Sequence, residues 1–104
     1  MKHFLLFYEV GPEFLQQREK YRTKHLELAW QTAGRGELLL AGALAPPTDR
    51  AVLLFKGESP AVAEAFAKQD PYVTSGLVKS WSVRQWNTVV AEGAATPLKP
   101  DATR

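Results

Sequence analysis

The chain has 104 residues, which suits a single domain large enough to bury a core of its own. Its 45% hydrophobic and 23% charged residues are the balance of an ordinary globular protein, and its formal net charge is only +2. Basic residues are scattered among acidic ones, which argues against a nucleic-acid-binding surface. Cysteine is absent, so disulfide and thiolate chemistry are excluded and a reducing, cytoplasmic location is expected.

The first predicted element is a strand over residues 3–10, HFLLFYEV. Its apolar part is too short to span a membrane and no small-residue cleavage site follows it, so we expect neither a membrane anchor nor a signal peptide. Both alternating faces of the strand are mainly apolar: Phe4, Leu6, Tyr8 and Val10 lie on one face, and Leu5 and Phe7 lie on the other. This pattern is typical of a strand that is covered on both sides.

A helix is predicted next, from Glu13 to about Ala33, because good helix formers dominate there and no Gly or Pro interrupts them. Gly34 and Gly36 then supply a stop. Two short apolar runs follow at residues 36–44 and 50–57, and the turn residues APPTD between them indicate a hairpin.

A second helix is predicted to begin at Ser59 and Pro60 and to end near Gln69, and a last strand is predicted over residues 80–90. The order βαββαβ is the ferredoxin-like arrangement, an α+β fold in which helices cover one face of a four-stranded antiparallel sheet. We expect this domain to occupy residues 1–90. Residues 91–104 have almost no bulky apolar side chain and are predicted to form a flexible tail or a strap on a partner subunit.

The uncovered sheet face predicts a partner. Two helices cover only one face of four strands, yet the first strand is apolar on both faces. The simplest resolution is a homodimer in which the uncovered face packs on a second copy, giving a dimeric α/β barrel.

Three polar side chains lie in the middle of the apolar face of the first predicted helix. Arg18, Arg22 and His25 follow the spacing i, i+4, i+7, so they line up along the helix. The apolar residues that flank them are Leu15, Leu26, Ala29 and Ala33 on one side and Phe14, Tyr21 and Leu28 on the other. Burying an unpaired charge is costly, so either acids such as Glu9 or Asp70 pair with the arginines, or the stripe lines a polar pocket.

Four stretches together resemble the YciI-like (YCII-related) family of the dimeric α+β-barrel superfamily. They are RxxxRxxHL (Arg18, Arg22, His25 and Leu26), GELLLAGAL, DPYVTSGLV after the second helix, and WSVRQWN in the last strand. The similarity spans residues 2 to 90 and does not cover the tail. It implies a ferredoxin-like fold, dimerisation through the sheet faces, and a His-Asp active-site pair that falls on His25 and Asp70.

Such a pair suits general acid/base catalysis, because a carboxylate on one imidazole nitrogen fixes the tautomer while the other nitrogen faces substrate. Pro71 ends the second helix near Asp70, and we predict that this carboxylate lies within hydrogen-bond reach of His25. Arg18 or Arg22 would bind an anionic oxygen of the substrate or stabilise an enolate, and Tyr72 would donate a hydrogen bond.

The function expected from these residues is that of a small, cofactor-independent lyase or isomerase acting on an aromatic or anionic metabolite. A non-catalytic ligand-binding or dimerisation module that uses the same pocket is the alternative, and a closed ion-pair network without a cavity is a third. No metal site is expected, because His3 and His25 lack HxH or HExxH spacing and His3 is interpreted as structural. Trp81, Trp86 and Phe66 would suit the wall of an aromatic pocket, although a core or interface position is favoured for the tryptophans.

Overall fold

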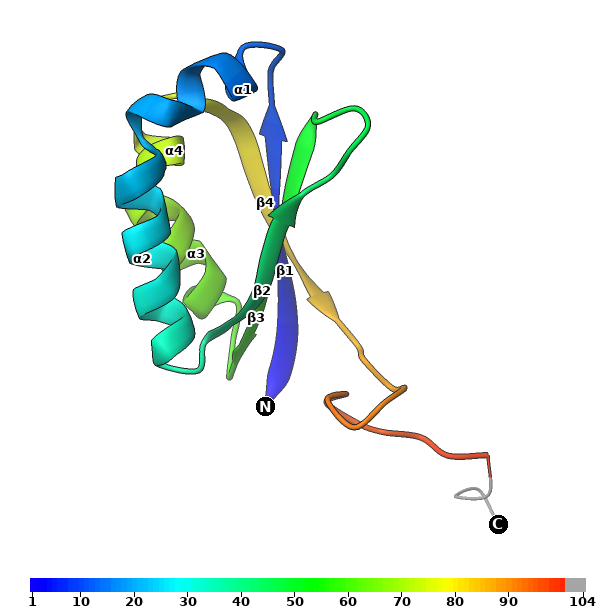
Figure 1. The fold of residues 1–104 in the computed structure, drawn as a ribbon. Helices are drawn as coiled ribbons and strands as arrows, with labels where there is room; N and C mark the ends of the chain where they lie inside the picture. The colour runs from blue at the N-terminus through cyan, green and yellow to red at the C-terminus, as the bar shows by residue number, and fades with distance from the viewer. Residues whose placement is uncertain (101–104) are drawn as a thin grey trace.

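The structure, a computed structural model, describes residues 1–100 of the chain. Its elements in order are β1 (Lys2–Val10), α1 (Phe14–Gln17), a 3-10 turn η1 (Arg18–Lys20), α2 (Arg22–Gly34), β2 (Leu38–Ala43), β3 (Arg50–Gly57), α3 (Ala61–Gln69), α4 (Pro71–Thr74) and β4 (Val78–Trp86). The strands form one antiparallel sheet in the order β2-β3-β1-β4, and the helices lie on one side of it (Figure 1). The predicted ferredoxin-like α+β fold is confirmed.

The core lies between the helices and one face of the sheet. The register places Leu6 of β1 beside Leu53 of β3 and Val83 of β4, so these three side chains share the face that the helices cover. From the helix layer, Phe66 of α3 packs against Phe55 of β3 with ring centroids 5.4 Å apart. Four alternate residues of β1 are buried on this face, namely Phe4, Leu6, Tyr8 and Val10. This is one of the two apolar faces that the strand pattern predicted.

The other face of the sheet carries no helix (Figure 1). On it, Leu5 of β1 lies beside Leu54 of β3, and Phe7 lies beside Val52. All four side chains are only half-buried in the single chain. At the margins of the sheet, Leu40 of β2 is 73% exposed and Trp86 of β4 is 48% exposed. The open face is therefore apolar across its centre.

The continuous helix predicted from residue 13 to residue 33 is wrong. The chain forms α1, then η1, and leaves helical geometry at Tyr21 (φ −120°, ψ −2°) before α2 begins. A 3-10 turn winds more tightly than an α-helix, so the stripe does not keep one phase through the break. Leu15, expected on the buried face, is 51% exposed, whereas Phe14 is buried against the core. The break lets α1 cross the end of the sheet while α2 runs along it (Figure 1).

The last strand begins and ends earlier than predicted, at Val78 and Trp86, and the unpredicted helix α4 precedes it. Beyond β4, residues 87–100 form an arm that projects from the body of the domain (Figure 1). The arm folds back on itself, because Thr96 N–H donates to Thr88 O and Leu98 N–H donates to Val89 O. The end of the predicted tail, residues 101–104, lies outside the described residues. Within residues 1–100, no helix has the length and apolar character needed to cross a membrane.

Candidate functional site

Asp70 is a fully buried carboxylate that follows α3 and caps α4. Its Oδ1 accepts a hydrogen bond from the Tyr72 N–H at 3.0 Å, and its Oδ2 accepts one from the Tyr8 hydroxyl at 2.7 Å. His25 Nδ1 lies 2.8 Å from Oδ1 and 3.0 Å from Oδ2. Both oxygens therefore have donors, which is the condition under which a buried carboxylate is tolerated.

His25 lies one turn into α2, and the structure has the contact with Asp70 that was predicted for it. A carboxylate only accepts hydrogen bonds, so the Nδ1 atom of His25 carries a proton and, in the neutral ring, Nε2 is the free acceptor. The imidazole stacks on the ring of Tyr72, with centroids 3.9 Å apart and planes 9° apart. The Phe66 ring is nearly perpendicular to the imidazole, with ring centroids 6.4 Å apart. Packing and hydrogen bonding together hold the ring in one orientation.

Tyr8 is a member of this cluster that the sequence interpretation missed. It was counted only as an apolar residue of the first strand, but its hydroxyl reaches Asp70 from the buried face of β1. Burial, together with the adjacent Asp70 carboxylate, raises the pKa of Tyr8 far above the usual tyrosine value, so the phenol remains a neutral donor. The available signal was the phenol itself, because a buried tyrosine hydroxyl requires a hydrogen-bond partner.

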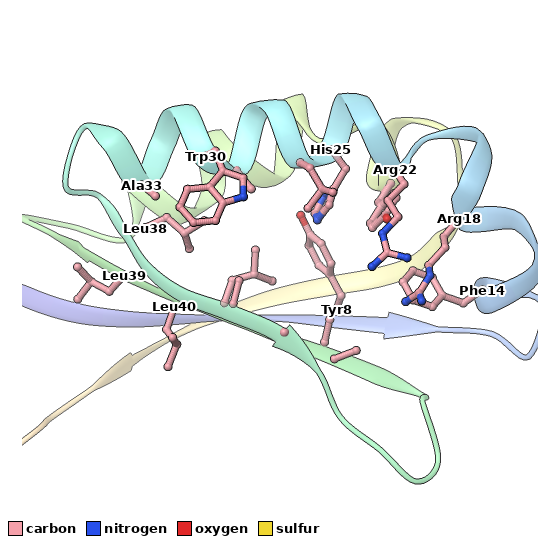
Figure 2. A pocket seen from close by; sticks show the side chains of 18 residues that line it. Tyr8, Phe14, Arg18, Arg22, His25, Trp30, Ala33, Leu38, Leu39 and Leu40 are labelled. Atoms are coloured by element: carbon pink, nitrogen blue, oxygen red, sulfur yellow. The ribbon is translucent and has the colours of Figure 1, made fainter.

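His25 lines a cavity of ≈ 410 Å³ between the helix layer and the sheet. Arg18 and Arg22 line the same cavity, and Figure 2 shows their guanidinium groups together on one side of His25. Arg22 contacts the exposed Glu19 at 3.5 Å, and the Arg18 guanidinium lies 5.8 Å from the centre of the Phe14 ring. The stripe of three polar residues therefore faces a cavity even though the helix that carries it is broken.

The alternative of a closed ion-pair network is wrong for both acids that were named for it, because neither Glu9 nor Asp70 pairs with Arg18 or Arg22. Glu9 pairs with Arg50, at 2.6 Å, on the open face of the sheet. The hydrogen bonds of Asp70 described above go to the Tyr8, His25 and Tyr72 groups rather than to an arginine. The two acids that the ion-pair alternative offered to the arginines are thus bound to other partners.

The aromatic residues around the cavity differ from those that the sequence suggested. Tyr72 lines it, and burial raises the pKa of the Tyr72 phenol, partly offset by the nearby Arg22 and Arg18 charges. Trp30 also lines the cavity, although nothing in the sequence pattern marked this residue. The side chains that were considered for the wall lie elsewhere: Phe66 and Trp81 pack in or against the core, and Trp86 is half exposed on the open face.

No group of three or more His, Cys, Asp or Glu side chains within residues 1–100 is arranged to hold a metal ion. The acidic and imidazole groups of the cavity are instead paired with each other. The chemistry available at this position is hydrogen bonding, proton transfer and anion binding.

These features define a small ferredoxin-like α+β protein in which a buried acid–histidine pair borders a cationic cavity. The chain belongs to the YCII-related family, because the model of the YCII-related domain matches residues 1–87. Among curated proteins, no sequence matches the chain significantly.

Two solved structures share the fold. The first is 5-chloro-2-hydroxyhydroquinone dehydrochlorinase (TftG) from Burkholderia phenoliruptrix AC1100, in complex with 2,5-dihydroxybenzoquinone. It has a TM-score of 0.68 and 20% identity over 83% of this chain and 94% of that one. The second is protein Atu4242 from Agrobacterium tumefaciens, with a TM-score of 0.57 and 15% identity over 92% of this chain and 99% of that one. At these identities the likeness establishes the fold.

Proposed function

We propose that this protein is a small enzyme of the lyase or isomerase type that needs no cofactor and moves a proton through His25. The observation that carries the proposal is the bond between His25 Nδ1 and the buried Asp70 carboxylate, 2.8 Å long, at the wall of a cavity. A histidine held by an acid on one nitrogen is prepared to accept or donate a proton with the other.

In the proposed reaction, His25 Nε2 removes a proton from a substrate carbon or hydroxyl next to a carbonyl. The electron pair of the broken bond moves toward the carbonyl oxygen, or expels a leaving anion from the neighbouring carbon. The imidazolium then returns its proton to the product or to water. Asp70 is a positioning residue in this scheme, since it is fully buried and acts through the imidazole.

Arg18 and Arg22 supply positive charge where negative charge develops. Their guanidinium groups lie beside His25 in the cavity, so a substrate oxygen bound there becomes an enolate or phenolate next to fixed cations (Figure 2). The Tyr72 ring supports the imidazole by stacking, and its hydroxyl is proposed as a donor to the substrate. Each group has a role that requires no metal.

The structural neighbour TftG supports the type of reaction. TftG is named as a dehydrochlorinase, an enzyme that removes a proton and a chloride, and its complex holds a hydroxylated quinone. We therefore favour elimination or tautomerisation at a hydroxylated ring for this chain. Chloride need not be the leaving group, because the same proton transfer begins either reaction.

The decisive experiment follows proton transfer without requiring the natural substrate. Hydroxylated quinols, with and without a ring chlorine, are incubated with and without the protein in heavy water. Deuterium entry at ring carbons is measured by NMR and chloride release by ion chromatography. We expect His25→Gln to lower the rate by about 10²–10⁴. The matched control is His3→Gln, which alters the chain's other histidine, on the opposite sheet face, where its Nδ1 contacts Thr88 Oγ1 at 2.6 Å. Equal loss in both variants would contradict the proposal.

Asp70→Asn tests the positioning role. The amide group would face Nδ1 of His25 and favour the tautomer with its proton on Nε2, which has no lone pair for the substrate proton. We expect a rate loss of about 10³–10⁴, as for an acid that sets a histidine tautomer. Nitrogen-15 NMR of the imidazole should show the exchanged tautomer, and an unchanged tautomer with lost activity would show that Asp70 acts in another way.

A non-catalytic binding module is the second candidate, and it is favoured by the two arginines that the cavity wall carries beside one another. In that case benzoate or a hydroxyquinol would raise the melting temperature and be recovered unchanged, without deuterium on its ring carbons beyond that of a protein-free sample, after long incubation. The exchange experiment above separates the two candidates, since only the enzyme moves protons.

We also propose a homodimer formed through the open sheet face. The centre of that face is apolar, with Phe7 and Leu54 half-buried in the single chain, and its margin exposes Leu40 and Trp86. An apolar face of this kind is normally covered in solution. Residues 87–100, which project from the domain, are the segment that would reach across the partner (Figure 1). A cytoplasmic location remains a prediction from the sequence.

A further inference from the structure

The cavity beside His25 extends well beyond the acid–histidine pair. In Figure 2, Arg18 and Arg22 lie on one side of His25, whereas Trp30, Ala33 and Leu38 lie on the other. His25 thus stands between a cationic end and an apolar end. The proposed chemistry uses the cationic end and the middle, and leaves the apolar end without a role.

The helix itself makes room at the apolar end. Ala29 and Ala33 follow His25 at intervals of four residues on α2, so they continue along the same face, and both line the cavity. At 1.5 Å per residue, the span from His25 to Ala33 is roughly 12 Å. Two methyl groups line this length where larger side chains would fill it.

The size of the cavity also exceeds what one small ring requires. A cavity of about 150 Å³ is enough to hold benzene, and this one measures ≈ 410 Å³. A single hydroxylated ring bound against His25 and the arginines would leave most of that volume to water, in contact with apolar walls. A ligand with a longer apolar body would displace that water.

Trp30 is another unusual feature of the apolar end of the cavity. It is the largest side chain type in proteins, yet here it is 75% exposed, at the rim of the cavity. Leu38, from β2, lines the cavity opposite it and is buried. An indole in this position gains apolar contact when a flat or extended group lies between it and the sheet.

We propose that the site takes an amphipathic anion: an acidic or phenolic head at Arg18 and Arg22, a reacting carbon at His25, and an apolar extension along Ala29 and Ala33 under Trp30. The extension is an alkyl chain or a second aromatic ring. The position of the reacting carbon rests on the proposed function, but the binding of the head and the extension does not require turnover.

The test uses 4-alkylbenzoates of increasing chain length as probes, titrated calorimetrically into the full-length protein. Each methylene that enters the apolar end should lower Kd by about three- to fourfold, until the extension is filled. Binding should occur at one site per chain. Arg22→Gln should weaken benzoate and the longer probes by the same factor, because all of them share the head.

Ala33→Phe places a ring in the apolar end. It should leave the affinity for benzoate unchanged and abolish the gain from the longer chains, whereas the matched control Ala65→Phe, at an exposed position of α3, should keep that gain. Because Ala33 also packs against the core, Trp30→Ala provides a second variant at an exposed side chain, and it should reduce the gain as well.

A Kd that does not change with chain length overturns the proposal, as does a gain that survives in both Ala33→Phe and Trp30→Ala. Neither result changes the conclusion about proton transfer, which deuterium entry measures separately. Conversely, a chain-length effect without any deuterium entry supports the amphipathic ligand and removes the proposed enzyme activity.

Discussion

Asp70 connects three elements through one side chain. It caps α4 through the Tyr72 N–H, receives the Tyr8 hydroxyl from β1, and holds His25 on α2. Its partners lie 62 and 45 residues away along the chain for Tyr8 and His25. A buried carboxylate with all its donors present is stable, but each donor that is removed leaves part of the charge unpaired. The same contacts therefore serve both stability and the orientation of the imidazole.

Tyr8→Phe tests the stabilising part of this cluster through its pH dependence. Below about pH 10 the phenol is protonated in both the folded and the unfolded state, so its contribution is complete, and the variant should lose about 1–2 kcal/mol. Because the folded-state pKa of Tyr8 is raised, the unfolded state loses the proton first as the pH rises past 10. The wild-type free energy of unfolding then falls by about 1.4 kcal/mol per pH unit for this group.

The measurement is urea unfolding of both proteins at about pH 8 and about pH 11. The stability difference between them should shrink at the higher pH, because Phe has no proton to lose. Tyr21→Phe, which alters a tyrosine outside the Asp70 cluster, serves as the control. The change in its free energy of unfolding between the two pH values should be close to that of the wild type. A difference that is constant with pH would contradict the raised pKa.

The break between α1 and α2 shows why the first helix was predicted incorrectly. No Gly or Pro marks it, and intrinsic helix propensity is too weak to reveal it. What favours the break is that Phe14 and His25 both contact Tyr72: the ring centroids of Phe14 and Tyr72 lie 5.5 Å apart, and those of His25 and Tyr72 lie 3.9 Å apart. In a straight helix the eleven residue steps from Phe14 to His25 would separate the two side chains by about 16 Å, which is too far for one tyrosine ring to contact both.

The junction of β3 and α3 requires a glycine. A Cβ on Gly57 would lie 2.8 Å from Cγ1 of Val62, because the short connection brings the strand end against the helix. We expect Gly57→Ala to lower the free energy of unfolding by about 1–3 kcal/mol, the usual cost of overpacking. Val62→Ala introduced in the same protein should recover part of the loss.

Gly34→Ala is the control for that prediction. It lies at the end of α2, and a Cβ there meets no atom within 4 Å. We expect no loss of stability, and a gain of up to about 1 kcal/mol because alanine restricts the unfolded chain. Thermal and urea unfolding of the two variants measure the contrast, and equal destabilisation by both would refute the packing argument.

The two faces of the sheet differ across the whole molecule. The helix-covered face holds the core and the cavity, whereas the open face presents half-buried apolar side chains (Figure 1). Because the sheet separates the two faces, the proposed dimer contact on the open face and the proposed chemistry at His25 use different side chains. A variant that disrupts the open-face contact should leave the geometry of the His25–Asp70 pair unchanged.

Leu54→Glu tests the proposed dimer. A carboxylate at the centre of the open face would meet its copy across a two-fold axis, so we expect the protein to become monomeric. Sedimentation equilibrium measures the mass, and the nitrogen-15 spectrum of His25 reports whether the Asp70 contact persists. Leu15→Glu, an exposed leucine on the helix side, should leave the mass unchanged. A wild-type protein that is already monomeric would refute the dimer.

The sequence by itself determined the order of the four strands and the two main helical segments, the apolar character of both faces of β1, and the polar stripe of Arg18, Arg22 and His25. These follow from local periodicity and turn chemistry, which need no knowledge of distant contacts. The pairing of His25 with Asp70 came instead from the resemblance of the motifs to a family.

Only the tertiary structure decided how these parts meet. It brought Tyr8 to Asp70, broke the first helix at Tyr21, and placed Trp30 at the rim of the cavity. The physical reason is that each of these features depends on packing between elements far apart along the chain. Local sequence patterns indicate which side chains face inward, but the packing of the layers determines which of those side chains contact each other.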